Sequence, residues 1–160
     1  TFFFNNVVYS AGTKSTPKGS WSDGRQDNTY LKVTNGNFKK GVNALKQAKK
    51  YAKKEKKDKA KKRFNDAIKF FILSNNENPG NPNILNYLGF SFQKVGDFFM
   101  AEIYYNEGLD IDPGHVDINE YLGELYVETN RLDKAKERLK VLVNCKCEEF
   151  GKLKALIEKN

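Results

Sequence analysis

The sequence repeats itself at a spacing of 34 residues across its second half. Residues 87–89, Tyr-Leu-Gly, return as residues 121–123, and Ala101 returns as Ala135. The same step backwards relates Ala101 to Ala67. A fixed period in this range is the signature of supersecondary units that stack on one another. The chain is therefore predicted to be a stack of similar units that serves as a binding scaffold.

Helical periodicity accounts for the chain from Phe38 onwards. Phe38, Val42, Leu45 and Ala48 fall on one helix stripe, and similar stripes follow after each turn signal. The breaks between them are rich in Gly, Pro, Asn and Asp, which favour turns and helix caps. The pattern predicts helices at about 37–53, 57–76, 82–94, 98–110, 116–128 and 132–144, and a short closing helix after Cys147.

The first helix pair is predicted to be longer than the others. If Ala48 holds the position of Gly89, then 19 residues separate Ala48 from Ala67, whereas 12 separate Gly89 from Ala101. The surplus of seven residues corresponds to two helical turns, one for each helix.

Small residues recur where helices must cross closely. A glycine inside a helix costs about 1 kcal/mol relative to alanine, so a close helix contact is expected at Gly89 and Gly123. Ala67, Ala101 and Ala135 are predicted to have the same role in the second helix of each pair. Nine large residues are expected to fill the layers between helices, namely Leu85, Leu88, Phe92, Phe98, Tyr105, Leu122, Tyr126, Leu132 and Leu139.

Residues 82–147 resemble two consecutive tetratricopeptide repeats. The resemblance rests on Leu85, Leu88-Gly89, Phe92, Ala101, Tyr105, Gly108 and Pro113, and then on Asn119, Leu122-Gly123, Tyr126, Ala135, Leu139, Leu142 and Cys147. Gly108, Asn119, Leu142 and Cys147 depart from the family pattern. The resemblance implies an all-α superhelix of about 2.5–3 repeats over residues 37–160, with a C-terminal capping helix.

Such repeats bind ligands in a concave groove lined by the first helix of each pair. The resemblance places eleven residues in that groove: Asn83, Asn86, Tyr87, Phe90, Gln93, Lys94, Asp117, Glu120, Tyr121, Glu124 and Glu128. Its four carboxylates share one helix face, which favours a cationic ligand or a basic neighbour, or else a plain solvated face. Glu120 and Glu124 contradict the Lys and Asn pattern of repeats that bind chaperone tails. The predicted function is a protein-binding or peptide-binding scaffold with a basic partner, and self-association is a further interpretation.

The net charge of +8 comes from one segment. Residues 46–63 hold eleven basic residues against Glu55 and Asp58. The predicted basic patch consists of Lys49, Lys50, Lys53, Lys54, Lys56 and Lys57. It favours either a solvated helix face or an envelope-associated structural protein that contacts an anionic membrane surface or polymer. Nucleic acid is disfavoured, because few aromatic residues are present to stack on bases.

Residues 1–36 differ in composition from the rest. Residues 1–10 are apolar and end in small residues, which is typical of the end of a secretory signal, or else of a truncated fragment or a short strand. Residues 11–37 have the composition of a flexible linker. We therefore expect an N-terminal extension over 1–36 and an exported, periplasmic protein, with a cytoplasmic protein as the alternative. The order Cys145-x-Cys147-Glu148-Glu149-Phe150 also resembles small exported bacterial proteins.

Cysteine and histidine offer little chemistry. Cys145 and Cys147 are interpreted as reduced thiols, as a disulfide that needs a bent backbone, or as metal ligands. His115 follows a Pro-Gly turn and has no partner at ligand spacing. The sequence therefore predicts no enzyme activity, no cofactor and no metal site.

Overall fold

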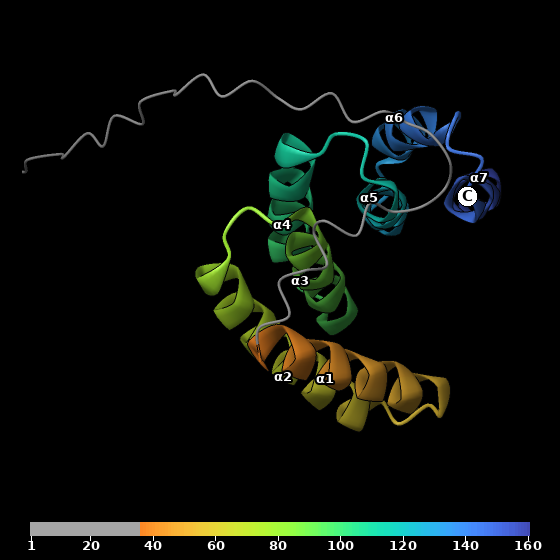
Figure 1. The fold of residues 1–160 in the computed structure, drawn as a ribbon. Coiled ribbons are helices and arrows are strands. Elements are labelled where there is room, and N and C mark those ends of the chain that lie inside the picture. The colour runs from red at the N-terminus through yellow and green to blue at the C-terminus, as the bar shows by residue number, and fades with distance from the viewer. Residues whose placement is uncertain (1–35) are drawn as a thin grey trace, which may run out of the picture.

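The computed structural model describes residues 36–160, which fold into helices joined by short turns (Figure 1). The helices are α1 (Gly36–Lys53), α2 (Lys57–Glu77), α3 (Pro82–Val95), α4 (Phe98–Ile111), α5 (Val116–Glu128), α6 (Leu132–Leu142) and α7 (Glu148–Glu158). No strand occurs in this range, so the all-α prediction is confirmed. The predicted signal remnant and linker lie outside the described residues, apart from the start of α1.

The helices form successive antiparallel pairs. α1 packs on α2, α3 on α4 and α5 on α6, while α2 contacts α3 and α4 contacts α5. α7 packs against α5 and α6, as expected of a capping helix. Figure 1 shows the pairs following one another along a curved stack, with the C-terminus on α7. No helix in the described range is both long and apolar enough to cross a membrane.

Local sequence explains where α3 and α4 begin and end. The Asn81 side chain accepts hydrogen bonds from the backbone N–H groups of Asn83 and Ile84, and a proline opens α3. Gly96, with a φ of +90°, ends α3 in the left-handed conformation that glycine adopts most readily. The Asp97 side chain then accepts from the Met100 N–H and caps α4.

The predicted small residues lie where helices touch. Ala67, Ala101 and Ala135 are completely buried. A Cβ added to Gly89 would lie 2.5 Å from Tyr105 Cδ1, so α3 approaches α4 more closely than any side chain would allow.

Gly123 has the same kind of contact with a later helix. A Cβ added there would lie 2.5 Å from Leu153 Cδ2 of α7. Gly108, which departs from the family pattern, is explained in the same way, because a Cβ there would lie 2.5 Å from Ile118 Cδ1. The close contacts of glycine therefore extend from the helix pairs to the junctions between them.

One of the predicted layer residues does not fill a layer. Phe98 is 38% exposed, since it is the first residue of α4 and lies at the edge of the stack. By contrast, Leu85, Leu88, Tyr105, Leu122 and Tyr126 are buried.

The first two helices have the predicted bounds to within one residue, but their surplus over an ordinary repeat is larger than the predicted seven residues. The residue equivalent to Gly89 is Gly41 rather than Ala48, because a Cβ on Gly41 would lie 2.7 Å from Phe71 Cδ1 just as Gly89 abuts Tyr105. Thirty residues separate Gly41 from Phe71, whereas 16 separate Gly89 from Tyr105. The surplus is 14 residues, about two extra turns in each helix. It places nearly the whole lysine-rich segment 46–63 in an overhang beyond the ordinary repeat.

Candidate functional site

The first helices of the pairs, together with α7, present their side chains to one side of the stack. Lys49 Nζ of α1 lies 4.5 Å from the centroid of the Phe90 ring of α3. The Phe90 ring lies 5.0 Å from that of Tyr121 on α5. Lys152 Nζ of α7 lies 3.8 Å from Glu120 Oε1 of α5. Four helices thus contribute to one continuous surface, which we call the groove.

Three predicted groove residues hold α3 to α5. Asn83 Oδ1 lies 3.2 Å from His115 Nε2 at the start of the two helices. At their other end Gln93 Nε2 donates to Glu128 Oε2 at 2.9 Å. Gln93 Oε1 also accepts from the buried Tyr105 hydroxyl at 3.0 Å. The interface between these two repeats is therefore held by polar contacts of Asn83, Gln93 and Glu128.

Asn86 and Tyr87 lie on α3 between these ends. Asn86 is buried, and its Oδ1 has no hydrogen-bond partner within the described part of the chain. The Tyr87 ring stacks on Phe71 with a centroid distance of 5.1 Å. Burial raises the pKa of the Tyr87 hydroxyl, which therefore stays protonated and able to donate.

Three of the four acidic residues of α5 are more buried than residues of a solvated face, whereas Glu128 is exposed. Glu120 is only 2% exposed, and burial raises its pKa to about 7 against the opposing effect of Lys152. Burial likewise raises the pKa values of Asp117 and Glu124. Lys152 is the basic neighbour of Glu120, while Lys49, which lies within residues 46–63, acts together with Lys152 to lower the pKa of Asp117 against the effect of burial.

Three carboxylates gather at this end of the groove. Oxygen atoms of Asp117, Glu120 and Glu149 lie within 4.8 Å of one another. Within residues 36–160 this is the one group of carboxylates placed closely enough to hold a cation. The Lys152 ammonium, 3.8 Å from both Glu120 and Glu149, already supplies positive charge to two of them.

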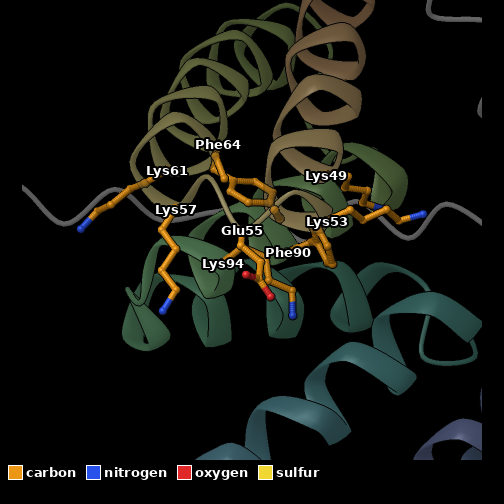
Figure 2. A pocket seen from close by; sticks show the side chains of 10 residues that line it. Lys49, Lys53, Glu55, Lys57, Lys61, Phe64, Phe90 and Lys94 are labelled. Atoms are coloured by element: carbon orange, nitrogen blue, oxygen red, sulfur yellow. The ribbon is translucent and has the colours of Figure 1, made fainter.

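A pocket of about 650 Å³ opens at the other end, between the overhanging hairpin and α3. Figure 2 shows Phe64 and Phe90 between two groups of lysines. The lining residues are Lys49, Ala52, Lys53, Glu55, Lys57, Ala60, Lys61, Phe64, Phe90 and Lys94. Burial and the nearby charge of Lys94 lower the pKa of Lys49. We call this recess the lysine pocket.

The structure divides the predicted basic patch into two groups. Lys49, Lys53 and Lys57 line the lysine pocket, whereas Lys50, Lys54 and Lys56 are exposed and do not line it. Sequence reasoning missed Lys61 and Phe64 as pocket residues. The signal that could have found them is the 14-residue surplus, which shows that α2 extends beyond its equivalent in the next repeat.

Cys145 and Cys147 form a disulfide in the turn between α6 and α7. Their Cα atoms are 5.1 Å apart, within the usual range for a disulfide. The intervening Lys146 has a φ of +50°, which supplies the bent backbone that such a short loop needs. The disulfide lies at the base of α7, the helix that contributes Glu149 and Lys152 to the groove.

Comparison with known proteins agrees with this geometry. The family model described as tetratricopeptide repeat matches residues 96–157, from the turn after α3 into α7. The fold is a tetratricopeptide-repeat superhelix. The predicted fold class is confirmed, whereas export and bacterial origin stay predictions. A search of curated proteins finds no match to the sequence.

Solved tetratricopeptide-repeat structures share this fold at low identity. The Arabidopsis OM64 domain has 18% identity and a TM-score of 0.51, over 78% of this chain and 98% of its own. The first such domain of Spaghetti (RPAP3), bound to the HSP90 peptide SRMEEVD, has 15% identity and a TM-score of 0.57, over 76% and 96%. The TPR2B domain of yeast Sti1, in complex with pHsp70, has 19% identity and a TM-score of 0.51, over 76% and 98%.

Proposed function

We propose that this tetratricopeptide-repeat protein is a non-catalytic scaffold that binds a peptide segment of a partner protein along the groove. The observation that carries the proposal is the pair of aromatic rings in the middle of the groove. Phe90 and Tyr121 lie 5.0 Å apart, with Lys49 and Lys94 over the Phe90 ring at 4.5 and 5.1 Å. The two rings are tilted by 53° to each other, and an angled pair of rings bordered by charge suits side chains of an extended peptide.

The hydrogen-bonding groups beside the rings support the same proposal. Asn86 Oδ1 is a buried acceptor without a donor among residues 36–160, and a backbone N–H of a bound peptide would supply one when the side chain rotates toward the groove. The Tyr87 hydroxyl would donate a hydrogen bond to a carbonyl oxygen of the peptide. These two groups lie one helix turn before the Phe90 ring.

The acidic end of the groove favours a cation in the ligand. Asp117 and Glu124 are partly buried carboxylates with raised pKa values, so an added positive charge beside them is stabilising. The RPAP3 domain is bound to an HSP90 peptide, and the Sti1 domain is in complex with pHsp70. The carboxylates of α5 make this groove different in charge from one that binds an acidic chaperone tail, and we propose a ligand with Lys or Arg at the α5 end.

The experiment is selection of peptides on the immobilised protein, followed by affinity measurements with two charge-reversal variants. Glu124→Lys changes the groove, while Glu137→Lys makes the same change on the exposed face of α6. We expect selected peptides to carry Lys or Arg and to lose roughly tenfold in affinity for Glu124→Lys alone. Equal affinity of both variants would refute the groove assignment. We avoid Glu120→Lys because Glu120 is buried, so the substitution would disturb the fold.

A further inference from the structure

The lysine pocket exists because the first repeat is oversized. Its walls come from the last turns of α1 and the first turns of α2, the part of the hairpin that exceeds the ordinary repeat by 14 residues. Its floor includes Phe90 of the next repeat. A hairpin of ordinary length would end before this segment, so the recess is a property of this chain rather than of its fold.

The floor and the rim of the lysine pocket differ sharply in chemistry. Phe64 and Phe90 are 5% and 8% exposed, and their rings meet at a centroid distance of 6.2 Å. With Ala52 and Ala60 they form an apolar floor. The charged lining residues are Glu55 and five lysines, namely Lys49, Lys53, Lys57, Lys61 and Lys94.

The charges of the rim lysines are only partly compensated, because Lys49 attracts Asp117 and Lys94 attracts Glu124 beyond ion-pair distance. Within residues 36–160, none of the five makes an ion pair. Lys49 and Lys94 share the Phe90 ring, and their mutual repulsion contributes to the lowered pKa of Lys49. An anion bound between them would relieve this repulsion. The site therefore favours a ligand that brings negative charge together with an apolar group.

We propose that the lysine pocket binds an acidic peptide segment carrying one bulky apolar side chain, which lies against Phe64 and Phe90 while its neighbouring carboxylates contact the rim lysines. The inference rests on the proposed function and assigns the chemistry of one end of the same groove. The volume of about 650 Å³ is within the range of ligand pockets and exceeds one side chain. The ligand would thus be acidic and apolar at the α1 end and basic at the α5 end.

The position of the lysines favours a peptide over a membrane surface. A flat anionic surface would contact outward-facing Lys50, Lys54 and Lys56 at least as well as the lysines around the recess. An apolar floor below the charges serves a side chain that enters the pocket, and inorganic phosphate has no group to place there.

The test uses a fluorescein-labelled peptide with the core Glu-Glu-Phe-Glu-Glu and measures anisotropy against the 160-residue protein. Two triple variants remove three exposed charges each from the same hairpin. The first takes them from the pocket, with Lys53→Gln, Lys57→Gln and Lys61→Gln; the second takes them from outside it, with Lys50→Gln, Lys54→Gln and Lys56→Gln. We expect the pocket variant to lose about tenfold in affinity and the matched variant less than about twofold. Equal losses would overturn the proposal, because they would show a general charge effect.

Changes in the probe test the apolar floor. A peptide with alanine in place of phenylalanine should bind about tenfold more weakly, since it no longer buries a ring. Equal binding of both peptides would overturn the anchor. Inorganic phosphate should displace the labelled peptide no more than sodium chloride does at the same ionic strength. Vesicles that contain phosphatidylserine provide the membrane control. If both triple variants bind these vesicles more weakly than wild type, and by the same amount, the lysines belong to a membrane-binding surface and the proposal is overturned.

The outcomes separate this inference from the proposed function. If binding of the selected peptides depends on Glu124 but the pocket variant binds the acidic peptide as tightly as wild type, the proposed function is supported and the lysine-pocket proposal is refuted. If neither peptide class binds, both fail. Dependence on Glu124 and on the pocket lysines together supports a ligand of two opposite charges.

Discussion

Replacing Gly89 by alanine tests the closest helix contact in the stack. Alanine in place of a helical glycine gains about 1 kcal/mol from backbone propensity alone. At this position the new Cβ would lie 2.5 Å from Tyr105 Cδ1, so the ring must retreat by roughly 1 Å to reach an ordinary contact. Tyr105 is completely buried, and its hydroxyl donates to Gln93 at 3.0 Å, so it has little room to move. Overpacking of this kind costs about 3 kcal/mol, which leaves a net loss of about 2 kcal/mol.

Gly151→Ala is the matched control for this substitution. Gly151 also lies inside a helix, but a Cβ there would have nothing within 4 Å. We expect Gly151→Ala to stabilise the protein by about 0.5–1 kcal/mol and Gly89→Ala to lower the melting temperature by about 5–10 °C. Thermal unfolding followed by circular dichroism measures both. A rise in melting temperature for Gly89→Ala, or a loss that persists unchanged in a Tyr105→Leu background, would refute the close-contact argument.

Three further predictions concern stability. The pKa of Glu120 is about 4.5 in the unfolded chain and about 7 in the folded protein, so raising the pH through this window favours the unfolded chain. In urea denaturation, Glu120→Gln should be about 2 kcal/mol more stable than wild type at pH 8 and equal to it at pH 4. A difference in stability that does not change with pH would contradict the burial argument. Replacing Cys145 and Cys147 by serine opens a three-residue loop and should cost at most about 1.6 kcal/mol, and a larger loss under the same denaturation would show that the disulfide holds α7 in place. Leu88→Ala empties a fully buried site in α3 and should cost about 2–5 kcal/mol by calorimetry; a loss below about 1 kcal/mol would mean that the core closes over the cavity.

Much of the fold could be predicted from the sequence, because each repeat contains turn and capping residues that mark where its helices begin and end. Asn81 and Asp97 cap helices where the sequence places turns, and the buried alanines follow the repeat period. The misassignment of Ala48 has a physical cause. Ala48 is itself completely buried, so its pattern is that of a crossing residue, and only the contact with Phe71 identifies Gly41 as the closer approach.

The site was harder to predict than the fold, because the sequence does not show which side chains of other helices lie against a given helix face. Glu120 and Gln93 lie on the predicted face, yet one is buried beside Lys152 and the other bonds Glu128 and Tyr105. These three partners come from other helices. The lysine pocket likewise depends on how far the first hairpin extends over α3, which is a matter of tertiary packing.

The polar contacts at the two ends of α3 and α5 have a consequence for how the groove works. Asn83 meets His115 at one end and Gln93 meets Glu128 at the other, about 15 Å apart along the helix axis. Hydrogen bonds are directional, so two of them at this spacing resist both sliding and twisting of one repeat against the next. A ligand lying across Phe90 and Tyr121 would therefore meet a surface of fixed width, and little of its binding energy would be lost in ordering the protein.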